Sequence, residues 1–126
     1  MSSLRFNPDI HSIVVEASLK SRVTAIANLV VDTGASYVAL PWRLVNTIGI
    51  TIDPKKTLQI TTATTVETVP KVIIPEMTVL GKTVKNVEAI VKDLPPQAPV
   101  DGLLGLSFLR NFKLTIDFQK GLLSLD

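Results

Sequence analysis

A succession of short apolar runs, each ended by turn residues, is the feature that most restricts how this chain can fold. Val, Ile, Leu and Thr dominate the runs, and most of these residue types favour strands. Many short strands with turn signals between them are typical of an all-β barrel or sandwich. We therefore predict an all-β fold, with strands over residues 10–19, 22–31, 37–40, 57–69 (a hairpin), 72–80, 83–92, 112–118 and 122–125.

Two short helices are expected between these strands. Trp42, Val45 and Ile48 have helical spacing within residues 42–48, and Gly49 can end that helix. Ser107 is expected to cap a second helix over residues 108–111.

Length and composition exclude several classes of protein. The 126 residues suit one domain, residues 1–126, whose core needs no disulfide or metal staple. The net charge is +2, and the lysines are scattered along the chain rather than gathered in a basic run. No apolar run is long enough to span a bilayer. We therefore expect no nucleic-acid partner and no membrane contact. The first residues lack a signal-peptide pattern, so we expect a cytoplasmic protein, which could be a domain released from a longer precursor.

The residue types present also exclude most catalytic chemistries. His11 is the only histidine and there is no cysteine, so neither a nucleophilic triad nor a zinc site is expected. The six glycines are dispersed and form no phosphate-binding loop. We predict no metal and no cofactor, which leaves the carboxylates as catalytic candidates.

Asp32 differs from the other aspartates by its context. Five uncharged residues precede it, and Thr33 and Gly34 follow it. Burial of a carboxylate there is costly unless its surroundings compensate, which suggests a functional role for Asp32. The alternative interpretation is that Asp32-Thr33-Gly34 is an ordinary Asx turn between strands. Two carboxylates about 3 Å apart share one proton, so that one acts as base and the other as acid. Because the chain has one Asp-Thr-Gly, a two-fold symmetric dimer would supply Asp32 twice.

Two motifs resemble a known family. Leu29-Val30-Val31-Asp32-Thr33-Gly34-Ala35-Ser36 resembles the active-site loop of the retropepsin-like aspartic proteases. Leu103-Leu104-Gly105, followed by Phe108-Leu109, resembles the apolar-apolar-glycine motif of that family; together with Ile116-Asp117-Phe118 it looks closest to bacterial single-lobe members. The resemblance covers nearly the whole chain, from residue 10 to residue 126. It implies a single-lobe acid-protease barrel with one or two short helices, which homodimerisation closes into an active site.

The resemblance also implies roles for individual residues. Asp32 would be the catalytic residue, and Thr33, Gly34 and Ala35 would support the active-site loop. Substrate-binding residues are expected at Gly34, Ser36, Val38, Ala39, Thr62, Ala63, Thr64 and Leu103. Residues 62–65 would form the tip of a flap-like hairpin. Asp101 is expected either in a turn or beside the substrate cleft.

Two functions remain open from the sequence. The leading prediction is an aspartic endopeptidase that pairs with a second copy of itself and cleaves extended polypeptides. The alternative is a catalytically weak or inactive domain that binds peptides or dimerises, because the expected flap tip lacks the glycine common in this family. Residues 1–9 or the C-terminal residues would form the dimer sheet, and the sequence does not indicate which.

Overall fold

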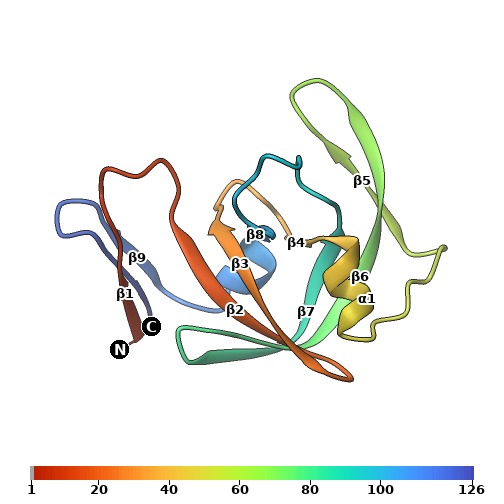
Figure 1. Cartoon of the computed structure of the whole chain (residues 1–126), viewed down its shortest axis with the longest axis horizontal. Coiled ribbons are helices and arrows are strands. Elements are labelled where there is room, and N and C mark those ends of the chain that lie inside the picture. The colour runs from red at the N-terminus through yellow and green to blue at the C-terminus, as the bar shows by residue number, and fades with distance from the viewer. Residues whose placement is uncertain (1) are drawn as a thin grey trace.

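The computed structural model describes residues 2–126 as ten strands and two short helices (Figure 1). Met1, the first residue of the expected dimer-sheet segment 1–9, lies outside the described residues. The elements are β1 Ser2–Arg5, β2 Val14–Lys20, β3 Thr24–Val31, β4 Val38–Leu40, α1 Trp42–Thr47, β5 Thr57–Thr61, β6 Val66–Val79, β7 Lys82–Val91, β8 Gly102–Leu104, α2 Leu106–Leu109, β9 Leu114–Asp117 and β10 Leu122–Leu125.

Six of the strands close into a barrel. The larger sheet has the order β2-β3-β8-β4-β7-β6-β5, and an additional pairing of β2 with β6 completes the ring. Most pairs are antiparallel, but β3–β8 and β4–β7 are parallel. The all-β prediction with two short helices is therefore confirmed, and β5 is the one strand of this sheet left outside the closed ring.

The remaining strands form a separate three-stranded antiparallel sheet with the order β1-β10-β9. Ser2 pairs with Leu125, and Leu122 pairs with Asp117, so both ends of the chain lie in this sheet (Figure 1). β10 is central and contributes the buried side chains Leu123 and Leu125. The terminal strands therefore pair within one protomer.

Small apolar side chains fill the barrel. In β2, Val15, Ala17 and Leu19 are buried, as expected for alternate residues of a strand with one face on the core. Phe108 of α2 is the largest fully buried side chain and packs beside Phe112. Within residues 2–126, no helix is both long and apolar enough to cross a membrane.

The strand prediction was wrong about a break near Pro70. β6 is one continuous strand of 14 residues through Pro70 and Pro75. Pro70 pairs with Thr57 at the end of the β5 ladder, where a strand tolerates proline. Pro75 lies opposite Asn86, at a position that the β6–β7 ladder skips, so its missing N–H removes no ladder hydrogen bond there.

Candidate active site

Asp32 lies immediately after the last residue of β3, where the parallel ladder with β8 ends. Val31 pairs with Leu104, and the Asp32 N–H donates to the Leu104 carbonyl oxygen at 3.0 Å. The chain then turns sharply: the Gly34 N–H donates to Asp32 Oδ1 at 2.9 Å, and the Ala35 N–H donates to the Asp32 carbonyl oxygen at 3.2 Å. The Asp32 side chain is thereby oriented by its own loop, and it remains partly exposed.

The glycines of the second motif allow two backbone segments to approach closely. A Cβ atom on Gly102 would lie 1.9 Å from the Ala39 carbonyl oxygen, and one on Gly105 would lie 2.3 Å from that of Tyr37. Beyond Gly105, the Leu106 N–H donates to the Ala35 carbonyl oxygen at 2.8 Å. The Gly-Leu-Leu-Gly segment is therefore hydrogen-bonded to the active-site loop, and any side chain at either glycine would separate them.

Ser107 holds the far end of this loop, which differs from its expected role as a helix cap. Helix α2 begins at Leu106 with Gly105 at the N-cap, and no side chain caps it. The Ser107 hydroxyl instead donates to the Glu88 carbonyl oxygen at 2.7 Å and accepts from the Val38 N–H at 2.9 Å. It thus connects β4 to β7 directly after the loop. A serine near a short helix is compatible with either role, so the sequence could not distinguish them.

A cavity of about 410 Å³ opens between the active-site loop and the β5–β6 hairpin. It is lined by Asp32, Gly34, Ala35, Ser36, Tyr37, Ala39, Gln59, Ile60, Thr61, Thr62, Ile90, Lys92, Leu94 and Leu103. Two larger hollows, of about 600 and 580 Å³, lack Asp32, so we assign the site by its chemistry rather than by size. Residues 2–126 contain no cluster of His, Cys, Asp and Glu that could hold a metal ion.

The comparisons with known proteins agree with this geometry. Residues 15–108 match the aspartyl protease family. The chain belongs to this family. A retropepsin-like aspartic protease from Rickettsia conorii has a similar structure, with a TM-score of 0.69 and 27% sequence identity over 98% of this chain and 87% of that chain. A search of curated proteins found no match.

Family and fold together support an aspartic protease function and identify the fold as retropepsin-like. Within this fold, the described residues place Asp32 at the position expected from the sequence, in the floor of the cavity. Thr33 is exposed at the end of the loop, and Asp101 lies outside the cavity. Asp101 accepts from the Asn28 N–H at 2.8 Å and pairs with Arg43, so of its two expected placements the structure favours the turn.

The expected substrate-binding residues divide into three groups. Gly34, Ser36, Ala39, Thr62 and Leu103 line the cavity. Ala63 and Thr64 lie in the hairpin tip but do not contribute to the cavity wall. The prediction that Val38 binds substrate is wrong, because its side chain is fully buried in the barrel core. Adjacent residues of a strand point to opposite faces, so Ala39 faces the cavity while Val38 faces the core.

Several residues of the cavity wall were not identified from the sequence. They are Tyr37, Gln59, Ile60, Thr61, Ile90, Lys92 and Leu94. A period of two was the available signal: Ile90, Lys92 and Leu94 are alternate residues at and beyond the end of β7. That signal becomes useful only once one residue of the strand is known to face the site.

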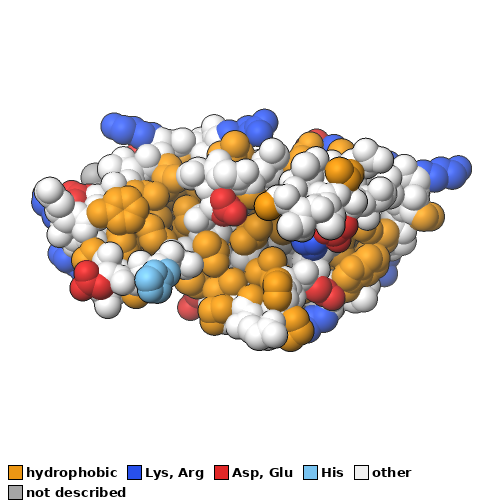
Figure 2. Space-filling view, turned by 90° about the horizontal axis from the view of Figure 1, so that it is seen from above, with side chains coloured by type: hydrophobic (Ala, Val, Ile, Leu, Met, Phe, Trp, Pro, Cys, Tyr) orange, Lys and Arg blue, Asp and Glu red, His pale blue; other side chains and the backbone are white. Residues whose placement is uncertain are grey.

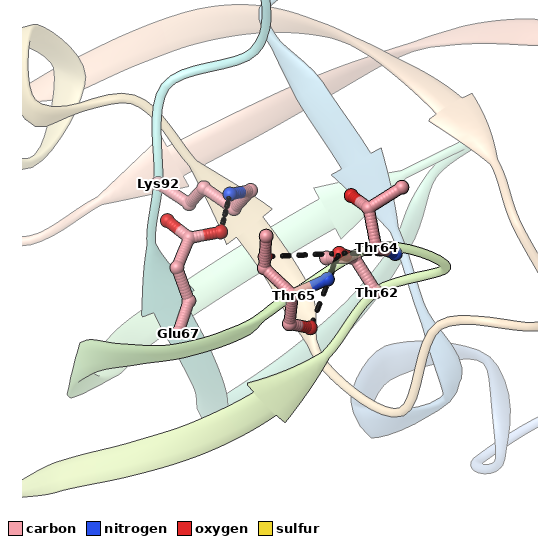
Figure 3. Close-up of polar contacts among 5 residues, drawn as sticks. All are labelled: Thr62, Thr64, Thr65, Glu67 and Lys92. Carbon is pink, nitrogen blue, oxygen red and sulfur yellow. Dashed lines mark hydrogen bonds and ion pairs between the residues drawn. The ribbon is translucent and has the colours of Figure 1, made fainter.

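The flap was predicted correctly as a hairpin with its tip at residues 62–65. β5 and β6 pair from Thr57 and Pro70 to Thr61 and Val66, and the Thr62 N–H donates to the Thr65 carbonyl oxygen at 2.8 Å. The Thr62 hydroxyl accepts from the Thr65 N–H at 3.1 Å and lies 3.1 Å from the Thr65 hydroxyl (Figure 3). Among residues 2–126, positive φ outside glycine occurs only at Leu80 and Asn86. This tip therefore does not need glycine.

The β5–β6 hairpin packs against β4 and β7 of the barrel through a small apolar cluster. Leu58, Ile60 and Val69 of the hairpin pack with Ala39 and Ile90 of the barrel, next to Tyr37 and Leu103. This cluster is separate from the main core. Five of its residues also line the cavity, and the cluster gives that part of the wall its apolar character: Tyr37, Ala39, Ile60, Ile90 and Leu103.

Proposed function

We propose that the chain is an aspartic endopeptidase whose active form is a homodimer with Asp32 from each protomer at its centre. The observation that carries the proposal is the number of carboxylates: Asp32 supplies the only one among the described residues that line the cavity. Acid–base activation of water in this kind of site uses two carboxylates that share a proton. A two-fold axis beside Asp32 supplies the second without any further residue.

In the proposed dimer, the ionised carboxylate takes a proton from a water molecule placed between the two Asp32 side chains. That water attacks the peptide carbonyl carbon, while the protonated carboxylate donates its proton to the carbonyl oxygen. The hydrogen bond from Gly34 to Asp32 Oδ1 supports this role, because it fixes the carboxylate relative to the loop without a competing cation. Collapse of the tetrahedral intermediate then breaks the C–N bond, with proton transfer to the leaving amine.

Exposed residues of the active-site loop, together with exposed apolar side chains before and in β2 and after β9, support pairing with a second copy. Thr33 and Gly34 are exposed, and the large apolar side chains of Ile10, Val14 and Phe118 are 45%, 38% and 61% exposed. Seen from above, one group of hydrophobic side chains lies at the end that carries the terminal sheet, and others lie in the middle and at the opposite end (Figure 2). Exposed apolar patches of this kind often mark protein interfaces. We infer that β1-β10-β9 and the active-site loop face the partner.

An extended polypeptide is the substrate that fits the cavity. β5 is an edge strand of the larger sheet, so its outer backbone groups are available to a peptide in strand conformation. Ile60 of the hairpin and Leu103 of β8 both offer apolar contacts in the cavity wall. These features favour apolar substrate side chains beside the cleaved bond.

Cleavage of an unstructured protein mixture across pH 3–7 tests this function, with the oligomer mass measured in the same samples. The native chain should cut, and Asp32→Asn should not. Mixing the two proteins at equal amounts sharpens the test. The activity is compared with that of the same total amount of native protein. If both carboxylates of a dimer are needed, subunit exchange leaves about a quarter of that activity, because only about a quarter of the dimers contain two native chains. Independent monomers would keep about half of it.

The alternative function is a peptide-binding module with weak or no catalysis. The edge strand β5 and the apolar cavity wall favour it, because both can bind an extended peptide whether or not a second carboxylate completes the site. A stable dimer that binds peptides, and in which neither the native chain nor Asp32→Asn cleaves, would establish the alternative.

A further inference from the structure

Lys92 provides the only positive charge among the described residues that line the cavity. It follows Val91, the last residue of β7, and its N–H donates to the Leu40 carbonyl oxygen at 2.9 Å. Lys92 is two residues beyond Ile90, so both side chains extend to the same face of the chain. The apolar wall of the cavity therefore ends in an ammonium group.

This charge has one ion-pair partner, which leaves part of its hydrogen-bonding capacity unused. The Lys92 ammonium forms an ion pair with Glu67 of β6, beside the flap tip (Figure 3). An ammonium has three N–H donors, and this contact uses one of them. The Lys92 side chain is 28% exposed, so the remaining donors are open to solvent or to a bound peptide.

We propose that Lys92 is a specificity-determining residue that selects substrates with an acidic side chain near the cleaved bond. This inference rests on the proposed peptidase function and goes further by naming one substrate feature. A carboxylate at this position gains a charge-assisted hydrogen bond in a partly enclosed cavity. A lysine or arginine there meets the Lys92 ammonium and is repelled, so the same residue also rejects basic substrates.

The spacing along β7 gives the position of the acidic side chain. Ile90 and Lys92 are two positions apart, and an extended peptide also repeats its side chains on one face every two residues. A substrate whose apolar side chain contacts Ile90 therefore presents the side chain two residues away to Lys92. The expected substrate has an apolar residue beside the cut and an acidic residue two positions from it.

The chain contains a matched control for this ion pair. Lys71 and Glu88 pair across the same two strands at 3.2 Å, with exposed fractions of 29% and 46% against 28% and 43% for Lys92 and Glu67. Lys71 does not line the cavity. Lys71→Met therefore removes a charge of matched pairing and exposure from outside the cavity lining. It also removes the Lys71 ammonium from the face of the Tyr37 ring, 5.9 Å from its centre, and Lys71→Arg keeps the charge there.

Mass spectrometry of the cuts made in a proteome-derived peptide library tests the proposal. Native cuts should be enriched in Asp or Glu at one position, and a matched Glu peptide should have a kcat/KM about tenfold above its Gln counterpart. Lys92→Met should abolish the enrichment while the apolar preference beside the cut remains; Lys92→Arg and Lys71→Met should keep it. Circular dichroism establishes that each variant is folded, and Lys92→Gln replaces Lys92→Met if the latter is not.

Peptide binding separates the failure of this proposal from the failure of the proposed function. Two octapeptide pools, with a central Glu or a central Gln among Ala, Val, Leu and Thr, are titrated into the Asp32→Asn protein by calorimetry. Tighter binding of the Glu pool that disappears with the added Lys92→Met supports the proposal even if no variant cleaves. Equal binding of the pools, or an acidic enrichment that persists in Lys92→Met, overturns it. If the native chain cleaves no peptide, that result overturns only the proposed peptidase function.

Discussion

The backbone N–H of Asp32 donates a hydrogen bond of 3.0 Å to the carbonyl oxygen of Leu104. This bond continues the parallel pairing of β3 with β8 by one residue, at the point where β3 becomes the active-site loop. Asp32 and Leu104 are 72 positions apart, yet the two motifs that contain them lie on adjacent strands of one ladder. A substitution that displaces the Leu104 backbone should therefore also displace the backbone that carries the Asp32 carboxylate.

Asp32→Asn should abolish peptide cleavage without loss of the fold. The amide retains an oxygen that can accept from the Gly34 N–H, so the loop keeps its internal hydrogen bond. The side chain, however, can no longer take and return a proton. We expect kcat to fall by about 10² to 10⁴-fold, the range for a lost acid–base group, in a peptide assay. An unchanged melting temperature must accompany the loss, since an unfolded variant would say nothing about catalysis.

Gly105→Ala should destabilise the protein far more than Gly34→Ala. A Cβ atom on Gly105 would lie 2.3 Å from the Tyr37 carbonyl oxygen, and backbone atoms there cannot move without parting the loop from α2. On Gly34, a Cβ atom meets only the Asp32 side chain, at 3.2 Å. Urea denaturation should give a loss of about 1–3 kcal/mol or more for Gly105→Ala, and much less for Gly34→Ala. Similar losses in both variants would contradict the close approach.

Features set by local residue pattern could be predicted from the sequence. The all-β fold, the helix predicted over residues 42–48 and the hairpin tip at residues 62–65 follow from period, turn chemistry and Gly49. Asp32 was singled out by the uncharged residues before it, by Thr33 and Gly34 after it, and by the resemblance of this segment to a known active-site loop. These features depend on neighbours in the chain, which a single sequence displays.

Features set by tertiary contacts could not be predicted in the same way. Val38 is apolar and near the loop, but only the pairing of β4 with β7 and β8 decides that it faces the core and Ala39 the cavity. Ser107 bonds to Val38 and Glu88, which are distant in sequence, so its neighbours in the chain gave no indication of its role. Lys92 was counted among the scattered surface lysines for the same reason.

Ser107→Ala should loosen the exit of the active-site loop. The substitution leaves the Val38 N–H and the Glu88 carbonyl oxygen without the hydroxyl that joins them. A buried polar group that loses its partner costs about 1–3 kcal/mol of unfolding free energy, and we expect a loss in that range together with a reduced kcat. Hydrogen exchange of the Val38 amide should accelerate. Thr47→Val is the matched control, because it removes an exposed hydroxyl–carbonyl bond at the end of α1 and should change stability by less than about 0.5 kcal/mol.

Thr62→Ala should loosen the flap tip, whereas Thr64→Ala should not. The Thr62 hydroxyl accepts from the Thr65 N–H and contacts the Thr65 hydroxyl, and so it closes the turn. Thr64 lies in the same tip and is also exposed, but only its backbone N–H reaches the Thr62 hydroxyl, at 3.4 Å. Loss of one such hydrogen bond should raise the exchange rate of the Thr65 amide about fivefold and raise KM, because the hairpin must order around the substrate. Equal exchange in the two variants would mean that the strand ladder alone, and not the threonine hydroxyl, holds the tip.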